Sequence, residues 1–478
     1  MSHEIELKLE VAPGATKQLM RQSWLNGAKR KSQRQLSVYF DTPEGELRER
    51  GYSLRVRSVG DHFFQTVKSL DTGAGLLERG EWEWEIEGAQ PDLTVLASTP
   101  LAGIDTGRLE AVVSSDVNRT ACRLTPEGAE VELDVDRGIM FAGGRELSVS
   151  EVEIELIRGE PSSVMSLARR IAEEVSVKLG VMSKAERGFA LATGALDQAT
   201  KAEPVVVQPD MSVAEAFEMI VTACVRHFRL NEPLVIHRRV PEALHQARVA
   251  VRRLGAAFAL FRSAVADDEF ARLRDEFRWF IRQLGDARNL DVYLRRTLPV
   301  ETRQRLERKR QAAYDLAIAA MESERFRWLI LDLVVWASFG TWRKGAKAKR
   351  RLEPYVRRRI DRQWKKISGT DGISGMKDER RHRLRIRIKK FRYSLEFMDS
   401  LYGQARKRKK KSAEAVKELQ EALGQLNDMV VARSFVLDDV CPTTCAAPGE
   451  EQRRHVRKAS RAINRMRKAG PYWRAKVA

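Results

Sequence analysis

Hydrophobic and polar residues alternate strictly at the start of the chain and again in several later segments. The opening residues read HEIELKLE, in which Glu4, Glu6 and Lys8 alternate with apolar positions. A period of two is typical of a β-strand with one apolar and one polar face. The pattern recurs at residues 36–42, 53–59, 63–69, 81–87, 129–136 and 151–157, with Gly, Pro and Asp between the segments. Residues 1–195 therefore predict an antiparallel β-meander.

The period then changes to that of a helix. Between Pro161 and Leu179 the pattern predicts one helix, which Gly180 ends. Residues 196–211 lose periodicity and predict a linker. Long helical segments rich in Ala, Leu, Arg and Lys fill residues 212–478. We therefore expect an α+β chain of two domains, in which the second is an all-α bundle.

The helical half contains an internal repeat. HQARVAVRRL, which begins at His245, matches HRLRIRIKKF, which begins at His382. A second pair follows in the same order, LGDARNLDV from Leu284 and LGQLNDMVV from Leu423. Two matched anchors predict a duplicated four-helix bundle. The expected repeats cover residues 212–340 and 345–440, with a connection at 344–373 and a basic tail at the end.

Charge is divided unevenly between the two halves. Residues 1–200 hold 24 Lys and Arg against 32 Asp and Glu, whereas residues 201–478 hold 62 against 34. The second half is expected to bind a polyanion, such as nucleic acid, an anionic membrane surface or polymeric phosphate. It lacks a basic sheet with interleaved aromatic residues and a recognition-helix motif, which disfavours nucleic acid.

Two further features indicate the compartment. No apolar run reaches 18 residues, and the best candidate, WLILDLVVWASFGTW, is short and contains Asp332, so no membrane span or signal peptide is expected. No paired metal-ligand set accompanies the four cysteines, which predicts inert thiols in a reduced, cytoplasmic setting: Cys122, Cys224, Cys441 and Cys445.

The charged faces of the predicted strands separate into acidic pairs and basic pairs. Taken singly, each strand is equally compatible with a polar face in solvent. If the sheet closes into a barrel, however, the charged faces line a tunnel. Basic pairs hold phosphate oxygens, and carboxylate pairs hold a hard divalent cation. Such a tunnel predicts metal-assisted attack of water on a terminal phosphoryl group.

The motif Glu4-x-Glu6-x-Lys8 resembles the signature of the CYTH, or triphosphate tunnel metalloenzyme, family. The resemblance covers residues 1–195 and includes, in the family's order, Arg55-x-Arg57, Lys68, Arg119, Glu132-x-Asp134, Glu151-x-Glu153 and Lys184. It implies an antiparallel barrel of about eight strands around a tunnel, with flanking helices. Members include inorganic, thiamine and RNA triphosphatases and a class of adenylyl cyclase.

The same resemblance implies an inorganic triphosphatase that uses Mg or Mn. It implies that the metal is bound by Glu4, Glu6, Glu151 and Glu153. It implies that the triphosphate is held by Lys8, Arg55, Arg57, Lys68, Arg119 and Lys184, which together with Glu4 and Glu6 form the catalytic set. The expected tunnel-lining acids are Glu81, Glu83, Glu132 and Asp134. No role is expected for Glu85, Asp136 or Glu155.

Helical spacing gives each repeat a stripe of one histidine and several cations. The simpler alternative is that these cations form a basic helix face exposed to solvent. A metal site at the histidines is disfavoured, because the surrounding cations would repel the metal. Residues 212–440 resemble the CHAD domain, in which Gly255 departs from a position where the family often has arginine. The resemblance implies that inorganic polyphosphate is bound by His245, Arg248, Arg252, Arg253, His382, Arg385, Lys389, Lys390 and Arg392.

Three alternatives stay open on the sequence. The chain is a nonenzymatic polyphosphate-binding protein, or its barrel acts on a nucleoside triphosphate as an NTPase or a cyclase, or the helical half binds nucleic acid. The expected location is the cytoplasm, with polyphosphate granules as one site there. The oligomeric state is left undetermined.

Overall fold

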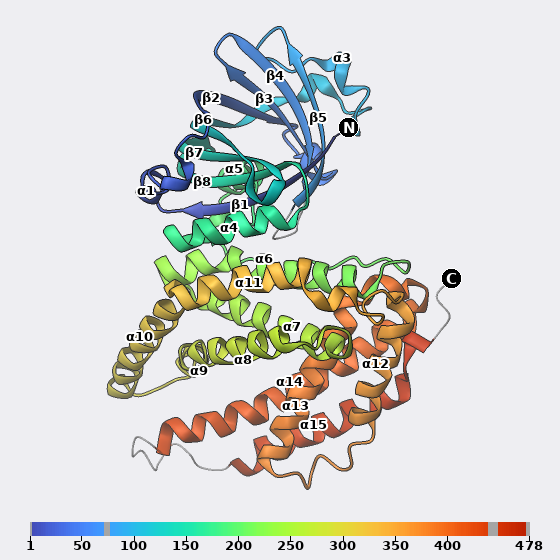
Figure 1. Ribbon diagram of the computed structural model, residues 1–478. Coiled ribbons are helices and arrows are strands. Elements are labelled where there is room, and N and C mark those ends of the chain that lie inside the picture. Colours follow the sequence, from blue (N-terminus) through green and yellow to red (C-terminus); the bar gives the residue numbers. More distant parts are fainter. Residues whose placement is uncertain (1, 71–76, 438–447, 475–478) are drawn as a thin grey trace. The chain divides into compact units, whose positions relative to one another are not determined.

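The computed structural model describes residues 2–70, 77–437 and 448–474 (Figure 1). The chain divides into two compact units. The strand unit consists of Met1–Lys201 with two later helical pieces, Val225–Ala243 and Met321–Val335. The helical unit consists of Ala202–Cys224, Leu244–Ala320 and Trp336–Ala478.

The strand unit is built on one antiparallel sheet of nine strands in the order β5-β4-β3-β2-β6-β7-β8-β1-β9. In addition, β1 pairs with β5, with Glu6 opposite Leu77. All six alternating segments after the opening one lie within strands of this sheet to within one residue, as the sequence predicted. The strands are β1 (Ser2–Val11), β2 (Arg30–Asp41), β3 (Tyr52–Val59), β4 (His62–Ser69), β5 (Leu77–Ile86), β6 (Glu110–Leu124), β7 (Glu130–Ala142), β8 (Arg145–Arg158) and β9 (Val177–Leu179).

The ninth strand corrects the predicted helix. Helix α4 (Ser162–Glu174) ends earlier than predicted, and Val175 is already extended, with φ of −138°. β-Branched valines at positions 175 and 177 favour extended backbone. The segment that follows pairs with β1, with Leu9 opposite Leu179.

Helix α5 (Lys184–Ala192) anchors the site described below. It packs on β6, β7 and β8 through Ala185 and Phe189, which lie in a buried cluster with Val113 and Met140. A Cβ atom at Gly188 would lie 2.4 Å from Val113 Cγ1, so only glycine permits this close approach. The remaining short helices are α1 (Ala15–Leu19), α2 (Glu46–Glu49) and α3 (Leu93–Leu96).

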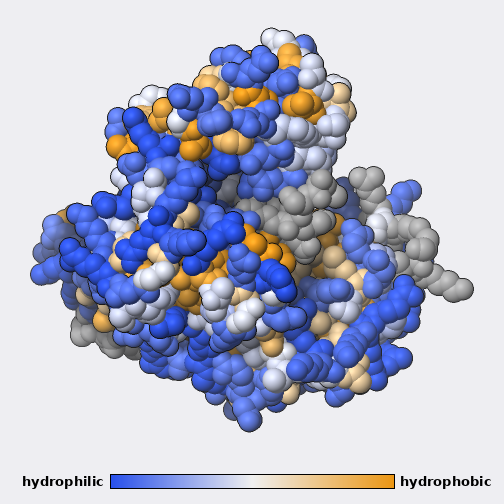
Figure 2. Space-filling view, turned by 45° about the horizontal axis from the view of Figure 1, so that its top comes forward, coloured by the Kyte–Doolittle hydropathy of each residue, from blue (hydrophilic) through white to orange (hydrophobic). Residues whose placement is uncertain are grey.

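Long helices fill the rest of the chain, as the sequence predicted. They are α6 (Val213–Arg238), α7 (Pro241–Val265), α8 (Asp268–Gln283), α9 (Gly285–Tyr293), α10 (Val300–Glu322), α11 (Glu324–Phe339), α12 (Leu352–Ser368), α13 (Asp378–Phe397), α14 (Arg406–Leu437) and α15 (Pro448–Ala469). Within the described ranges, none of these helices is long and apolar enough to cross a membrane. Hydrophilic residues cover most of the face shown in Figure 2.

The repeats fall on corresponding helices with one difference. The two histidine segments lie in α7 and α13. The later anchor of the first repeat lies at the break between α8 and α9, whereas that of the second lies inside α14. The expected connection at 344–373 contains a full helix, α12. Part of the basic tail forms α15, and Cys441 and Cys445 lie outside the described residues.

Candidate functional site

Strand register aligns the charged residues of the strand unit. Lys8 on β1 lies opposite Glu153 on β8, which in turn lies opposite Asp134 on β7. In a neighbouring row, Asp136 lies opposite both Arg119 on β6 and Glu151 on β8. Directly opposed residues project from the same face of a sheet. The register alone therefore gathers acids and bases from four strands.

Lys8, Arg119, Asp134 and Glu153 line one cavity of about 350 Å³, which we call the mixed-charge cavity. Asp136 and Glu151 are buried next to this lining and pair with Lys184, which belongs to it. All ten residues that the sequence assigned to the substrate or the tunnel are among its lining: Lys8, Arg55, Arg57, Lys68, Glu81, Glu83, Arg119, Glu132, Asp134 and Lys184. Glu6 and Glu153, which the sequence assigned to the metal, also line it.

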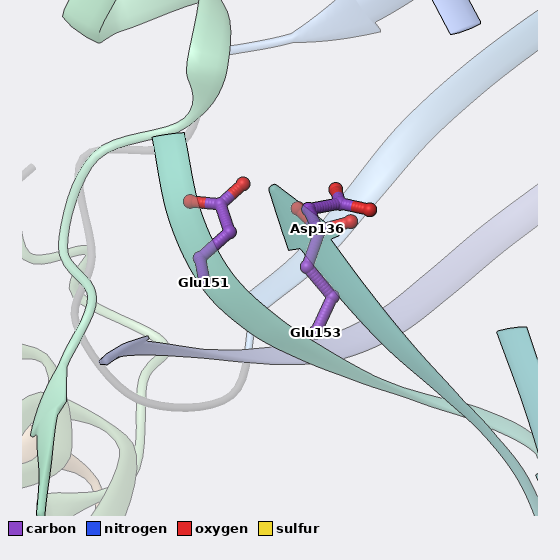
Figure 3. A group of neighbouring side chains, drawn as sticks. All are labelled: Asp136, Glu151 and Glu153. Atoms are coloured by element: carbon purple, nitrogen blue, oxygen red, sulfur yellow. The ribbon is translucent and has the colours of Figure 1, made fainter. Parts of the chain in front are cut away.

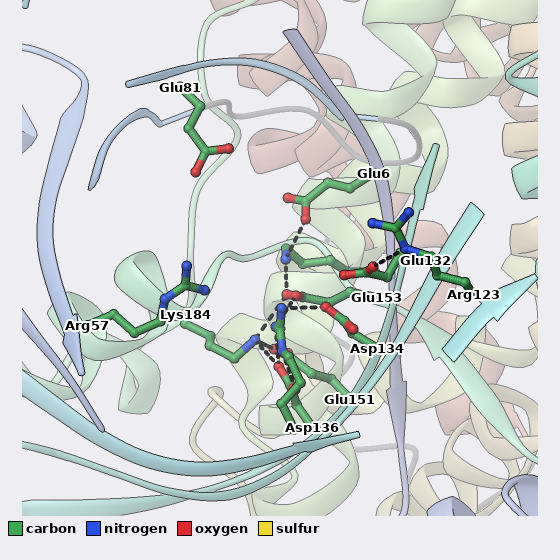
Figure 4. Close-up of polar contacts among 12 residues, drawn as sticks. Glu6, Arg57, Glu81, Arg123, Glu132, Asp134, Asp136, Glu151, Glu153 and Lys184 are labelled. Atoms are coloured by element: carbon green, nitrogen blue, oxygen red, sulfur yellow. Dashed lines mark hydrogen bonds and ion pairs between the residues drawn. The ribbon is translucent and has the colours of Figure 1, made fainter. Parts of the chain in front are cut away.

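Arg119 is the centre of the ion pairs on one wall. Figure 4 shows its three acidic partners, Asp134, Asp136 and Glu153, close together. Arg119 Nε donates to Asp136 Oδ1 at 2.8 Å, and one NH2 group contacts Asp136 Oδ2 and Glu153 Oε2, both at 2.6 Å. The other terminal nitrogen pairs with Asp134. One guanidinium thus holds three carboxylates in place.

Two lysines complete this wall. Lys8 pairs with Glu153 and, at 3.1 Å, with Glu6. Lys184 pairs with Glu151, with Asp136 at 2.6 Å and with Glu153 at 3.0 Å. It occupies the first position of α5, which a capping box between Ser183 and Glu186 fixes. The cavity acids are therefore matched to cations that come from two strands and a helix.

The opposite wall carries the basic residues of β3 and β4. Arg57 pairs with Glu83 at 3.2 Å, and Lys68 pairs with Glu81 at 3.2 Å. Arg55 donates to the Thr66 hydroxyl at 3.1 Å. The Nε atoms of both arginines are buried without a hydrogen-bond partner within the residues described. This wall therefore contains two donors that no described residue uses.

Burial and charge shift the ionisation of the acids in opposite directions. Burial alone would raise the pKa of Glu153, but Lys184, Lys8 and Arg119 hold it well below the ordinary value. Burial raises the pKa of Asp134 to about 7, despite the nearby Arg119. Burial alone would lower the pKa of Lys184, but the surrounding carboxylates raise it. Strongly shifted groups in one cavity are typical of a functional site.

Three carboxylates are arranged to hold a metal ion (Figure 3). One oxygen from each of Asp136, Glu151 and Glu153 lies within 4.8 Å of the others. Oxygen ligands of this kind suit Mg²⁺ or Mn²⁺. Beside them, Asp134 Oδ1 is buried and has no hydrogen-bond partner among the described residues. The donor set therefore fits a hard divalent cation.

The predicted metal ligands are only partly in this group. Glu151 and Glu153 belong to it, whereas Glu6 faces the cavity and pairs with Lys8. The side chain of Glu4 lies outside the described part of the chain.

Two residues of this network had no role in the prediction from the sequence. Asp136 contacts both Arg119 and Lys184. Arg187 pairs with Glu151. Spacing offered a signal for each, because Asp136 follows Asp134 by two positions on a strand and Arg187 follows Lys184 by one helical turn.

The helical unit has its own basic cavity between α7, α8 and α13, of about 570 Å³. We call it the repeat cavity. Six of the nine residues predicted to bind polyphosphate line it, together with an apolar wall that includes Phe258 and Phe277. The six are Arg248, Arg252, His382, Arg385, Lys389 and Lys390.

Three predicted residues are not in its lining. Arg253 is buried with its guanidinium 5.2 Å from the Phe397 ring centre. Arg392 pairs with Glu396 at 3.4 Å. His245 is the third. Gly255, the departure from the family pattern, lines the cavity and has open space where a side chain would begin.

The cations of the repeat cavity face one another. The Nε atoms of Arg248, Arg252 and Arg385 are buried without hydrogen-bond partners within the described ranges. Burial, followed by repulsion from Arg252 and Arg385, lowers the pKa of Lys389 to about 6. His382 Nδ1 donates to Asn427 Oδ1 at 2.7 Å, which leaves Nε2 available. The cavity thus concentrates positive charge with little internal compensation.

Comparison with known families agrees with this division. Residues 2–189 match the model of the CYTH domain, and residues 219–437 match the model of the CHAD domain. The two matched ranges contain the mixed-charge cavity and the repeat cavity, respectively.

Individual relatives are distant. An inorganic triphosphatase of Haemophilus influenzae is 27% identical over 197 residues. That match covers 40% of this chain and 55% of the relative, so the chain spans about half the length of the curated relative. The CHAD domain from Ricinus communis is 27% identical, with a TM-score of 0.46 over 59% of this chain and 98% of its own. An adenylyl cyclase from Hippeastrum with a dominant triphosphatase activity is 22% identical, with a TM-score of 0.32 over 40% and 96%.

Proposed function

Because this chain joins a CYTH domain to a CHAD domain, we propose that its strand unit hydrolyses inorganic triphosphate with a divalent cation, and that its helical unit binds inorganic polyphosphate. The proposed hydrolysis rests on the mixed-charge cavity, where a cluster of carboxylates lies beside cations from several strands. The name of the Haemophilus relative supports the choice of substrate.

Asp136, Glu151 and Glu153 would hold the cation, either Mg or Mn. When bound, it supplies Lewis-acid chemistry, drawing charge from phosphoryl oxygens. Lys184 and Arg119 neutralise these carboxylates in its absence. With the metal bound, both cations would be able to pair with the phosphate chain, because the metal would neutralise the carboxylates in their place.

Each wall of the mixed-charge cavity would bind part of the substrate. Lys8, Arg119 and Lys184 on one wall and Arg55, Arg57 and Lys68 on the other would bind the phosphate oxygens through charge-assisted hydrogen bonds. Holding the chain from both sides fixes the terminal phosphoryl group for attack by water. The pairing of β5 with β1 supports a barrel, with the cavity as its tunnel.

Polyphosphate binding by the helical unit rests on the repeat cavity. Its buried guanidinium groups have donors without partners among the described residues, and like charges converge there. A linear anion would satisfy those donors and remove the repulsion.

The hydrolysis is tested by Glu153→Gln in the full chain. This change keeps the shape of the side chain but removes the charge on which Lys8, Lys184 and Arg119 converge. We expect release of phosphate from tripolyphosphate with Mg or Mn to fall by about 100-fold or more. Glu146→Gln, on an exposed part of the same strand, is the matched control.

Thermal unfolding and polyphosphate binding show whether the variant is folded. If the wild-type chain binds tripolyphosphate but releases no phosphate, the proposed hydrolysis is wrong and the chain is a nonenzymatic binding protein. ATP, thiamine triphosphate and long-chain polyphosphate, assayed in parallel, would reveal a nucleotide-directed activity if ATP were turned over fastest.

A further inference from the structure

A second basic cavity in the helical unit, of about 680 Å³, is lined by no residue of the two histidine segments, 245–254 and 382–391. We call it the α12 cavity. Ser263 at the end of α7 lines one side, and the first turns of α12 line the other. Pro354 and Tyr355 also line it, and none of the lining residues is acidic. Its cations are Lys347, Arg350, Arg351, Arg358, Arg359 and Arg362.

Among the residues that the structure describes, these six cations form no ion pair and no side-chain hydrogen bond. Their neighbours in sequence behave differently, because Arg343 pairs with Glu218 at 2.7 Å and Arg357 with Glu353 at 3.6 Å. Six like charges around one concavity repel one another unless an anion is present.

The backbone under the cations is fixed. Arg351 forms an antiparallel bridge with Ser212. Val213 N donates to Arg350 O, and Leu352 N donates to Met211 O, both at 2.9 Å. On α12, positions 351, 358, 359 and 362 share one helical face. The cations are thus presented together by a rigid scaffold, which limits the entropy lost on binding.

The floor of the cavity is also held in place. The Tyr355 hydroxyl lies 2.9 Å from Ser263 Oγ and donates to the Phe261 carbonyl at 3.1 Å. The Tyr355 ring stacks on Phe261, with 6.0 Å between centroids. Arg359 lies over the other side of this arrangement, 5.5 Å from the Tyr355 ring centre. An aromatic platform of this kind orients a guanidinium.

Five guanidinium groups and one ammonium group, without acids, suit a ligand that carries many phosphate oxygens. The α12 cavity and the repeat cavity meet the same turn of α7, because Arg262 lines the repeat cavity and Ser263 lines the α12 cavity. Consecutive residues on a helix point about 100° apart, so the two cavities open on neighbouring sides of α7, and only a phosphate chain long enough to pass around the helix would reach both sets of cations.

We propose that the α12 cavity is a second binding site for linear phosphate polyanions, which long chains engage together with the repeat cavity. The inference rests on the proposed polyphosphate binding by the helical unit. Two linked sites strengthen binding without new contacts at either one. Preference for long chains over tripolyphosphate is the consequence.

The test is a triple charge reversal, Arg351→Glu, Arg358→Glu and Arg362→Glu, in the full chain. All three side chains are exposed, so folding should be retained. The matched control reverses three exposed arginines on α15, at Arg454, Arg457 and Arg461, for the same change in net charge. Binding of long-chain polyphosphate and of tripolyphosphate is measured for the wild type and both variants at one salt concentration.

We expect the α12 variant to lose about ten-fold or more in affinity for long chains relative to the control variant, with tripolyphosphate binding and hydrolysis unchanged. Equal losses in the two variants would overturn the α12 site and leave the proposed function standing. A wild type that binds no polyphosphate of any length would overturn both. If the α12 variant loses more affinity for RNA of matched charge than for polyphosphate, the assignment of the cavity to phosphate chains is wrong.

Discussion

The mixed-charge cavity and the repeat cavity use the same kinds of cationic side chain but surround them differently. In the first, Lys184 contacts three carboxylates. In the second, Lys389 faces Arg248, Arg252 and Arg385, with Asp428 as the nearby acid. The pKa of Lys184 is consequently raised although burial opposes this, whereas burial and repulsion lower the pKa of Lys389.

This difference implies two ways of binding phosphate. Under the proposed function, a phosphate chain in the mixed-charge cavity would meet carboxylates as well as cations, so its binding would need a divalent cation to neutralise them. A phosphate chain in the repeat cavity would meet mostly cations and would need no metal. We expect experiments on the two cavities to respond to metal, mutation, salt and pH in separable ways.

Metal removal should produce the largest contrast. We expect a chelator to reduce triphosphate hydrolysis by about 1,000-fold, because Lewis-acid stabilisation of the phosphoryl oxygens is worth several kcal/mol. Binding of long-chain polyphosphate to the same sample should stay within about two-fold. Phosphate release and polyphosphate binding, measured with and without the chelator, check both statements. Hydrolysis that persists in chelator would contradict the role given to the carboxylates.

Loss of one cation should affect stability differently in the two cavities. Arg119→Gln leaves Asp134, Asp136 and Glu153 without their common partner, which should cost about 3 kcal/mol in the free energy of unfolding. Arg252→Gln removes a charge that other cations repel, so stability without ligand should be unchanged or higher.

Chemical denaturation of the metal-free chain measures both values. Arg137→Gln, on an exposed position of β7, controls for loss of positive charge from the sheet. The idea fails if Arg252→Gln destabilises the chain as much as Arg119→Gln does.

The strand unit shows how much of the candidate site was predictable from the sequence. Alternation placed charges on one face of each strand, and the signs along β1, β3 and β8 were enough to predict a cavity lined by both acids and bases. The role of Asp136 was not predictable from alternation. It depends on register, which sets Asp136 opposite both Arg119 and Glu151.

In the helical unit, spacing placed the predicted residues on two helices but did not separate those that line the repeat cavity from those that do not. Arg253 follows Arg252 directly, and one residue on a helix turns by about 100°. That rotation takes Arg253 to Phe397 and away from the repeat cavity. The α12 cavity was missed for another reason, since its cations lie in a segment expected to be a connection, where no repeat drew attention to them.

We expect salt concentration to produce a smaller difference between the two cavities than the substitutions do. Binding to uncompensated cations releases counterions, so affinity of the helical unit for polyphosphate should fall by about ten-fold or more between about 50 and about 200 mM salt. Ion-paired cations hold fewer counterions, so the KM for triphosphate at saturating metal should change by about three-fold or less. Salt titrations of binding and of kinetics compare the slopes. Parallel slopes would mean that the two cavities are equally charged in solution.

The smallest expected effect concerns protons. Lys389 has a pKa of about 6 in the empty repeat cavity, so it is charged below this pH and neutral above it. A bound phosphate chain supplies negative charge and raises that pKa, so binding above pH 6 requires uptake of a proton. Affinity for long-chain polyphosphate should therefore fall as pH rises from about 6 to about 7.5, by about three- to ten-fold.

The comparison with Lys389→Arg isolates this lysine from His382, which lines the same cavity. Arginine stays charged throughout this range, so the variant should bind more tightly than the wild type at pH 7.5 and should show a shallower dependence on pH. Calorimetry in two buffers of different ionisation enthalpy should detect proton uptake by the wild type and less by the variant. Equal proton uptake by both would mean that Lys389 keeps its charge in the empty cavity, and that its neighbours repel it less than their positions imply.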